Sequence, residues 1–481
     1  MSKAKKADNP EKKRDYQQEV RVEPSDNAGE QSFALAETKG EDEKTVDTSN
    51  LLERVLHRDN LNYAYNRVLK NGGSPGVDGM KTDALLDFLK REGENLKESL
   101  LAGTYRPQPV RRVEIPKPDG GVRLLGIPTV VDRMIQQAIA QILSPIFEKE
   151  FSEHSYGFRP GRNAHQAIKK AEAYINEGYK VVVDIDLEKF FDKVNHDKLM
   201  YLLSLRIKDK RILKLIRAYL TSGIMTGGLV SSSDQGTPQG GPLSPLLSNV
   251  MLHELDKELE KRGHKFCRYA DDCNIYVKST KAGNRTMDSI SQFIEKQLKL
   301  KVNRDKSAVD RPSKRKFLGF SFYYAKGGVK IRVHGKSLKR LKEKLKSLTM
   351  RSSGNSMSDK ITKLNQVIQG WVNYFSPANM LIFCQRTDSW LRRRLRMCQW
   401  KQWKKVGTRH DNLVRLGISN FKAWEFANTR KGYWHTANSP ILSTSLTSEY
   451  LHSLGLKCLT AVYEQSLSLR TAVCRTARTV V

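Results

Sequence analysis

The stretch Lys265–Lys278 constrains the fold of this chain strongly, because two arms rich in aromatic and β-branched residues flank a pair of adjacent carboxylates. The arms at 266–269 and 274–277 surround residues that favour a turn, so the pattern predicts a β-hairpin. Adjacent carboxylates at a hairpin tip repel each other. Asp271 and Asp272 are explained if they face a divalent cation, since Mg²⁺ prefers oxygen ligands and completes its shell with water and phosphate. A polar turn without a ligand is the ordinary alternative, and it is favoured when these two residues are considered alone.

A second apolar run also ends in carboxylates. Residues 181–183 are all valine and predict a buried strand, and Asp186 follows where the pattern becomes helical. Asp184 shares a face with Asp186, because strand side chains alternate with a period of two, so spacing alone leaves both as candidate ligands. The carboxylates of Asp186, Asp271 and Asp272 would then lie on neighbouring strands. Three such groups could bind two metal ions about 4 Å apart, which is the arrangement used in phosphoryl transfer. This constellation resembles the palm of a reverse transcriptase, a family in which Tyr-Ala-Asp-Asp is the best-known tetrapeptide.

The overall charge indicates the class of partner. The chain has 481 residues, enough for roughly two to four domains, and its formal net charge of +32 would cause self-repulsion unless a polyanion were bound. Nucleic acid is therefore the expected partner. No apolar run of about 18 residues predicts a membrane span, and the N-terminal lysines precede no apolar segment typical of a secretory signal. The six cysteines include no Cys-x-x-Cys pair, which argues against zinc fingers and a disulfide framework, so we expect a cytoplasmic protein.

The charge is distributed unevenly along the chain. Residues 1–48 are polar with few large apolar side chains, so we expect a disordered tail. Residues 330–405 contain 19 lysines and arginines against three acidic residues, with leucines recurring at helical spacing and tryptophans between the cations. Helices with one apolar and one basic face would bury the first face and lay the second on a nucleic-acid backbone. A solvated helix face is the alternative for a shorter run, but the size of this charge excess argues against it.

Several loops carry further candidate residues. The segment 111–126 predicts a β-ribbon whose turn is flanked by Lys117 and Arg123, which either protect a sheet edge or bind phosphate. Arg159 and Arg162 lie in a Gly/Pro loop that opens a helix, where they either shape the loop or contact a phosphate backbone. The run Gln235–Asn249 is rich in glycine and proline; alone it would be interpreted as a structural turn, although its glycines also allow close approach of a ligand.

These motifs together identify a family resemblance. Tyr-Ala-Asp-Asp, the Gln-Gly-Thr-Pro-Gln-Gly loop, the Ser-Tyr-Gly-Phe-Arg-Pro-Gly-Arg stretch and the region from Gly-Trp-Val-Asn-Tyr-Phe to Trp-Lys-Gln-Trp make the chain resemble a group II intron-encoded reverse transcriptase with a maturase domain, most similar to the bacterial class C lineage. The resemblance runs from about Leu51 to Leu459. Many relatives end in a His-Asn-His endonuclease with paired cysteines, and residues 436–481 contain no such cluster, so we do not expect that domain here.

The resemblance implies an α+β right-hand polymerase with fingers, a palm built on an antiparallel sheet, and a helical thumb. It selects Asp186, with Asp271 and Asp272, as the holders of two Mg²⁺ ions, and it assigns Lys306 to protonation of the pyrophosphate leaving group. Phe191 would stack under the deoxyribose and exclude a 2′-hydroxyl. The residues expected to contact the incoming dNTP are Lys117, Arg123, Phe191 and Gln239. The residues expected to contact nucleic acid are Arg159, Arg162, Gly319, Arg392, Arg393, Arg394, Lys401 and Lys404.

The implied organisation has five parts: a tail at 1–48, an N-terminal extension and start of the fingers at 49–115, fingers and palm at 116–330, a helical thumb or maturase domain at 331–410, and a basic region at 411–481 for which DNA binding is a hypothesis.

The expected function is an RNA-directed DNA polymerase that binds its group II intron RNA and assists splicing and retrohoming by target-primed reverse transcription. Its partners would be that RNA, an RNA template with a DNA or RNA primer, target DNA and dNTPs. A free-standing reverse transcriptase in repair or phage defence, and an RNA-binding splicing factor with a vestigial polymerase site, are the alternatives. The oligomeric state is left open.

Overall fold

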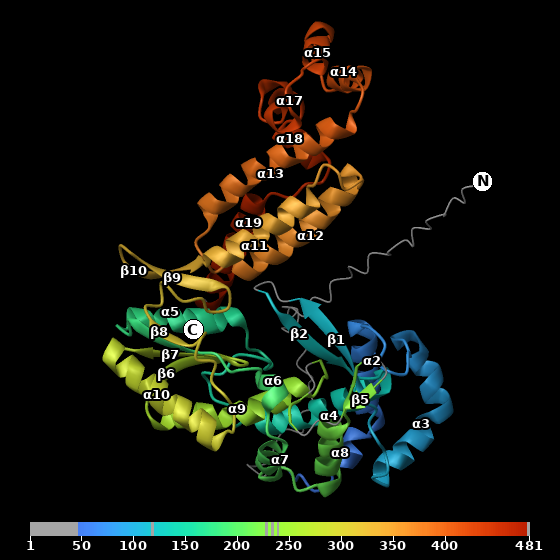
Figure 1. Ribbon diagram of the computed structural model, residues 1–481, viewed down its shortest axis with the longest axis vertical. Coiled ribbons are helices and arrows are strands. Elements are labelled where there is room, and N and C mark those ends of the chain that lie inside the picture. Colours follow the sequence, from blue (N-terminus) through green and yellow to red (C-terminus); the bar gives the residue numbers. More distant parts are fainter. Residues whose placement is uncertain (1–46, 117–119, 227–228, 232–234, 238–239, 479–481) are drawn as a thin grey trace, which may run out of the picture.

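The structure is a computed structural model that describes residues 47–116, 120–226, 229–231, 235–237 and 240–478. A lower body, in which helices surround two four-stranded sheets, supports a column of helices that rises from it (Figure 1). The mixture of helices with largely antiparallel sheets confirms the predicted α+β class. Within the described ranges, no helix is long and apolar enough to cross a membrane.

The N-terminal half of the body combines a helical layer with a sheet in the order β2-β1-β4-β5. The predicted ribbon is present, since β1 and β2 pair antiparallel from Arg111↔Ile127 to Pro116↔Val122, and β4 runs parallel to β1. Asn163 begins α5 with a capping box, in which its side chain and that of Gln166 satisfy each other's backbone amides. The elements are α1 (Leu51–Val55), α2 (Arg58–Asn71), η1 (Thr82–Ala84), α3 (Leu85–Leu101), β1 (Val110–Pro116), β2 (Val122–Ile127), α4 (Val130–Glu148), α5 (Ala164–Asn176), β4 (Ile224–Thr226) and β5 (Leu229–Ser231).

A second sheet, entirely antiparallel and ordered β6-β7-β3-β8, lies at the centre of the body. Side chains on the two faces of this sheet pack into two different hydrophobic cores. Val183 packs in one core with residues of α4, α9 and α10. Val182 packs in the other core with residues of α5 and of the hairpin formed by β9 (Phe320–Ala325) and β10 (Gly328–Val333). Both faces are therefore buried, which explains why β3 is a run of valines. The elements are β3 (Val181–Ile185), α6 (Phe190–Lys193), α7 (His196–Ser204), α8 (Lys210–Thr221), α9 (Ser244–Lys261), β6 (Lys265–Tyr269), β7 (Asp272–Val277), α10 (Thr280–Gln297) and β8 (Ala308–Asp310).

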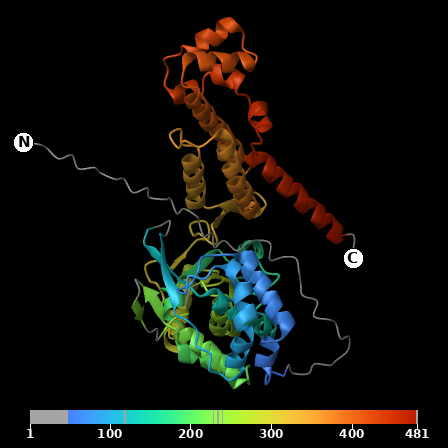
Figure 2. The same cartoon turned by 90° about the vertical axis from the view of Figure 1, so that its right-hand side faces the viewer.

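The hairpin β9 (Phe320–Ala325) and β10 (Gly328–Val333) joins this body to the helical column. The column contains α11 (Gly335–Leu348), α12 (Met357–Phe375), α13 (Leu381–Gln402) and α19 (Leu459–Arg478), and α19 packs against both α12 and α13. Five shorter helices form its far end, so that α19 brings the chain back towards the body (Figure 2). They are α14 (Val406–Arg415), α15 (Asn420–Ala427), α16 (Tyr433–Thr436), α17 (Pro440–Ser445) and α18 (Ser448–Ser453).

Candidate active site

The predicted hairpin is present, and Asp271 lies in its turn. Strands β6 and β7 pair up to Tyr269↔Asp272, which leaves Ala270 and Asp271 as a two-residue connection. Ala270 has φ +55°, a left-handed conformation that costs energy for a residue with a Cβ atom. Such strain persists only where the surroundings enforce it, so the protein holds this turn in a defined shape.

Asp186 lies beside the hairpin at the same end of the sheet. It follows β3 directly, and the register Ile185↔Cys273 brings it next to Asp272, the first residue of β7. Its backbone N–H donates to the Ser307 hydroxyl at 3.0 Å. Lys306 lies in the same turn as Ser307, and its Nζ is 3.9 Å from Asp186 Oδ2. The sequence-predicted residues Asp186, Asp272 and Lys306 therefore come together in space.

Asp184, the alternative ligand, has a partner of its own. Arg315 donates to Asp184 Oδ2 from Nη2 at 2.6 Å and from Nε at 2.9 Å. Burial raises the pKa of the Asp184 carboxyl, and the Arg315 guanidinium opposes this by stabilising the charged form. Because its negative charge is already compensated, Asp184 is a poorer candidate than Asp186 for holding a cation.

The remaining carboxylates concentrate negative charge. Asp272 lies at an exposed position, but the protein atoms around its carboxyl group displace part of the surrounding water. This desolvation, followed by the charges of Asp271, Asp184 and Asp186, raises the pKa of Asp272 to about 7. Burial and the charge of Asp186 also raise the pKa of Asp271, while the Arg123 guanidinium on β2 lowers it. A bound cation would relieve this repulsion.

The donor set fits magnesium. Among the described residues, no three His, Cys, Asp or Glu side chains are arranged to hold a metal ion by themselves. Mg²⁺ does not need such a cage, because it is commonly bound by one or two carboxylates together with water and substrate phosphates. The hard oxygens of Asp186, Asp271 and Asp272, whose repulsion is visible in the raised pKa values of the last two, match that requirement.

A buried network that sequence reasoning did not find supports the hairpin from behind. Arg268 on β6 and Asp256 on α9 are both 0% exposed and form a bidentate ion pair. Arg268 also donates to Asn249 Oδ1 and to the Ala270 carbonyl, each at 3.0 Å. The available signal in the sequence was an arginine that follows Phe266 and Cys267 in a strand, which implies a buried partner.

The loop at 155–162 also supports the hairpin rather than only lining a surface. Tyr156 N–H donates to the Arg268 carbonyl at 2.8 Å, and Asn249 Nδ2 donates to the Gly157 carbonyl at 2.9 Å. A Cβ atom on Gly157 would collide with the backbone N of Ala270, so only glycine allows this approach. The loop and the turn before Asp271 are thus in direct contact.

Arg159 occupies a different place from the one expected. Its side chain is buried, and its guanidinium bonds to the Glu148 carboxylate and to loop carbonyls, including that of Ser155 at 2.9 Å. It therefore holds the loop together and does not present its charge to a phosphate backbone. Arg162 is partly exposed and lies 5.8 Å from the Tyr156 ring.

The expected dNTP-contacting residues are only partly visible, because Lys117 and Gln239 lie outside the described residues. Arg123 is exposed on β2, and its charge reaches Asp271, as noted above. Phe191 is half-buried in α6, with its ring 5.1 Å from that of Phe190. Arg123 is therefore close enough to influence Asp271, while Phe191 lies in the short helix α6 that follows Asp186 in the chain.

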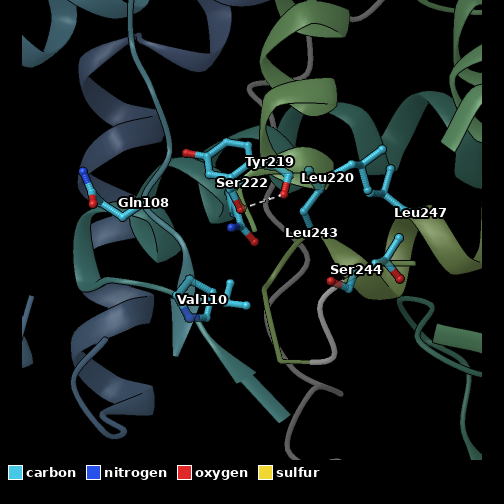
Figure 3. Close-up of a pocket in the computed structure, with 11 residues that line it drawn as sticks. Gln108, Val110, Tyr219, Leu220, Ser222, Leu243, Ser244 and Leu247 are labelled. Atoms are coloured by element: carbon cyan, nitrogen blue, oxygen red, sulfur yellow. Dashed lines mark hydrogen bonds between the residues drawn. The ribbon is translucent and has the colours of Figure 1, made fainter. Parts of the chain in front are cut away.

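The glycine-rich loop reaches the same region. Thr237 N–H donates to the Phe191 carbonyl at 2.6 Å, and a Cβ on Gly240 would come within 2.7 Å of the Gly126 carbonyl on β2. Beneath it lies a cavity of about 20 Å³, room for about one water molecule, with Tyr219 and Ser244 among its lining residues (Figure 3). That cavity is far too small for a nucleotide.

Several cations of the helical column are committed inside the protein. Arg393 Nη2 donates to the Trp434 carbonyl at 2.9 Å, and Arg393 Cζ lies 3.8 Å from the centroid of the Trp434 ring. Arg394 donates to the carbonyls of Lys346 and Thr349, near the end of α11, at 3.0 and 2.8 Å. A helix end leaves carbonyls without intrahelical partners, and an arginine satisfies them well. Arg393 and Arg394 are both partly exposed, so these internal bonds use only part of each guanidinium, and their expected contacts with nucleic acid stay predictions.

The other predicted contacts of this region are more open. Arg392 is partly exposed and donates to Ser389, Lys401 is partly exposed near the Tyr433 ring, and Lys404 is exposed. Gly319 lies at the junction of body and column, where φ is +83° and a Cβ would be 3.1 Å from the Phe375 ring. Gly319 is thus explained by packing at the junction.

Comparison with known proteins agrees with these features. Residues 115–322 match the family of reverse transcriptases (RNA-dependent DNA polymerases), and residues 338–417 match the maturase-specific domain of group II introns. The chain is 35% identical over 278 residues to protein YkfC of Escherichia coli, covering 50% of this chain and 73% of that protein. It is 30% identical over 370 residues to the group II intron-encoded protein LtrA of Lactococcus lactis, covering 63% of this chain and 61% of LtrA. A solved Cas6-RT-Cas1–Cas2 complex is similar at 23% identity and a TM-score of 0.33, over 51% of this chain and 43% of that chain, which is too distant to carry an argument.

Proposed function

Because the chain belongs to the reverse transcriptase family and contains a group II intron maturase domain, we propose that it is an RNA-directed DNA polymerase that works with a group II intron RNA. The observation that carries this proposal is the meeting of Asp186 with the Asp271–Asp272 turn at one end of an antiparallel sheet. Carboxylates at that place serve polymerisation and have no role in binding RNA.

The parts of the structure correspond to a right hand in this proposal. The central sheet is the palm, the β1–β2 ribbon with its helices forms the fingers, and the helices after the β9–β10 hairpin form the thumb. The proposed boundary between residues 330 and 331 falls within β10, the second strand of that hairpin, which ends at Val333. The basic region 411–481 would contact target DNA.

The carboxylates and their neighbours have distinct proposed roles. Asp186, Asp271 and Asp272 would hold two Mg²⁺ ions, which when bound activate the primer 3′-hydroxyl and stabilise the pyrophosphate leaving group. Lys306, with its Nζ 3.9 Å from Asp186, would donate a proton to the pyrophosphate. Arg123 would neutralise phosphate oxygens of the incoming dNTP.

The positive charge supports the nucleic-acid partners. The net charge of +32 and the basic segment at 330–405 favour a long polyanionic ligand. We assign the template–primer duplex to the space between central sheet and column, and the intron RNA to the column and the N-terminal helices. In this scheme the same protein assists splicing and then copies the intron RNA at a DNA target.

Primer extension tests the proposal. Wild type and Asp271→Ala are given an RNA template, a DNA primer, Mg²⁺ and dNTPs, and Asp288→Ala, an exposed carboxylate on α10, serves as the matched control. We expect extension by wild type and the control, and its loss in Asp271→Ala with RNA binding retained. Normal extension by Asp271→Ala would overturn the site. Failure of all three proteins with tight RNA binding would favour a splicing-only factor, and extension without affinity for any group II intron RNA would favour a free-standing reverse transcriptase.

A further inference from the structure

A groove of about 410 Å³ lies on the helical column, away from the candidate active site. Its walls come from α11 and α13, and its volume is in the range of sites that bind a small ligand or part of a larger one. The lining residues are Leu338, Lys339, Lys342, Glu343, Lys346, Phe383 and Trp390.

One wall of the groove is aromatic. Phe383 and Trp390 are seven positions apart on α13, so they share one face of the helix, and both are partly exposed. Each ring already attracts a cation, with Lys342 Nζ 5.8 Å from the Phe383 centroid and Arg394 Cζ 5.7 Å from the Trp390 centroid. Phe383 also lies 5.8 Å from the Trp371 ring, so each ring keeps only part of its surface exposed. Partly exposed aromatic rings beside cations are surfaces on which nucleic-acid bases stack.

The other wall is basic. Lys339, Lys342 and Lys346 lie on one face of α11, all exposed, and the row spans about 10 Å at the rise of an α-helix. That length matches about three stacked nucleotides, at roughly 3.4 Å each. Glu343 is the carboxylate that lines the groove, and it lies 3.9 Å from Lys339. Among the residues that the structure describes, Lys342 and Lys346 form no ion pair.

The two walls together restrict the occupant. An apolar peptide would leave the lysine row without counter-charges, and a duplex would use the lysines while its bases stay stacked away from the rings. An unpaired strand satisfies both walls, because its bases are free to stack and its phosphates lie beside them. The groove lies within residues 338–417, the segment matched by the group II intron maturase domain.

We propose that this groove binds a short unpaired segment of RNA, with a base stacked on Trp390 or Phe383 and the adjoining phosphates contacted by Lys339, Lys342 and Lys346. The choice of RNA rests on the proposed function, whereas the preference for an unpaired strand rests on the groove itself. Single-stranded loops of an intron RNA are the chemical class that fits.

Binding of a defined probe to the full chain, without dNTPs, tests this inference. The probe is a ten-nucleotide single-stranded RNA containing 2-aminopurine, compared with a blunt RNA duplex and with the matching single-stranded DNA. One variant carries Phe383→Leu and Trp390→Leu, which keep an apolar wall but remove both rings. A second carries Lys339→Gln, Lys342→Gln and Lys346→Gln, and its matched control carries the same change at the exposed palm-side lysines Lys261, Lys281 and Lys296.

The double leucine variant is expected to raise the Kd for single-stranded RNA at least fivefold, roughly the effect of losing one stacked base, and to abolish the fluorescence change of 2-aminopurine without affecting the duplex. The triple glutamine variant is expected to reduce the salt dependence of single-strand binding by about two units of logarithmic slope, which the control does not do. Thermal unfolding checks both variants, and the glutamine variant carries the test alone if the leucine variant does not fold.

Three outcomes would overturn the inference. They are an unchanged Kd for single-stranded RNA in both groove variants, an equal loss for duplex and single strand, and equal affinity for the single-stranded DNA, which would remove the assignment to RNA. Primer extension by wild type and Asp271→Ala is a separate measurement. If the groove variants bind RNA normally, the polymerase proposal is unaffected. If primer extension fails, the result of the RNA-binding experiment still decides whether the groove binds an unpaired strand.

Discussion

Arg268 and Asp256 form an ion pair that is closed to solvent, with Nε and Nη2 of the arginine 2.7 and 2.6 Å from the two carboxylate oxygens. The same guanidinium donates to the Ala270 carbonyl, one residue before Asp271. The pair therefore joins α9 to the strained turn that carries the candidate metal ligand. Loss of the pair should both destabilise the core and disturb the position of Asp271.

Arg268→Gln is expected to lower the free energy of unfolding by about 3–5 kcal/mol, because it leaves the Asp256 charge buried without its partner. It is also expected to reduce primer extension at temperatures where the variant remains folded, since the Ala270 carbonyl loses a donor. Chemical denaturation and extension assays measure the two effects. Arg262→Gln, which breaks the partly exposed pair with Glu258, is the control and is expected to cost about 1 kcal/mol or less. A similar small cost for Arg268→Gln would contradict the role of this pair.

Gly157→Ala is expected to disturb the turn that carries Asp271. The added Cβ would meet the backbone N of Ala270 and lie 2.9 Å from the Tyr269 carbonyl carbon, so the loop and the hairpin must move apart. Such overpacking typically lowers the free energy of unfolding by about 1–3 kcal/mol. We expect primer extension to be reduced even at temperatures where the variant remains folded. Gly93→Ala on α3 has no atoms within 4 Å of the new Cβ and is expected to be neutral or stabilising. Unchanged extension by Gly157→Ala would show that the contact does not position Asp271.

Phe191→Ala is expected to relax discrimination between deoxyribonucleotides and ribonucleotides. Removing the half-buried ring opens space for a 2′-hydroxyl, and steric exclusion of this size is worth roughly tenfold or more in relative kcat/KM. The measurement is the ratio of kcat/KM for a dNTP and its matching rNTP. Phe190→Leu is the neighbouring control: this ring is buried in the core, so its loss should lower stability without changing the ratio. An unaltered ratio in Phe191→Ala would remove the sugar-contacting role.

His253→Leu is expected to make the protein less sensitive to acid. The imidazole is 7% exposed on α9, its ring lies 5.6 Å from that of Phe151, and burial lowers its pKa below the usual value. In the unfolded chain this histidine takes up a proton near pH 6.5, whereas in the folded state it does so only at lower pH. Its contribution to the free energy of unfolding is therefore complete above about pH 6.5 and is lost as the pH falls below it, with a slope of up to about 1.4 kcal/mol per pH unit.

Denaturation between pH 5 and 8 measures the effect of His253→Leu. The variant and wild type should converge in their pH dependence above pH 7 and diverge below 6.5, with the variant losing less stability. Replacement of the exposed His435 by leucine is the control and should leave the profile of the wild type unchanged. Parallel profiles for His253→Leu and wild type would show that another group governs the acid loss.

Local sequence patterns were enough to predict the main strands of the central sheet and the residues of the candidate site. The hairpin at 265–277 and the strand at 181–185 were predictable because alternation of side chains and turn preference act between near neighbours. Asp186, Asp271 and Asp272 followed from those elements together with the family resemblance. Lys117 and Gln239 stay predictions, since they lie outside the described residues.

The partners of the charged side chains could not be predicted from local patterns, because they come from distant parts of the chain. Arg315 reaches Asp184 across 131 positions, Arg394 reaches Thr349 across 45, and no local pattern encodes such a meeting. Arg159 and Arg393, which were expected to contact nucleic acid, also form bonds inside the protein, because internal carbonyls and carboxylates compete for their donors. The sequence shows which groups a charged side chain can bind. The packing of distant segments decides whether the side chain binds such a group inside the protein or remains available at its surface.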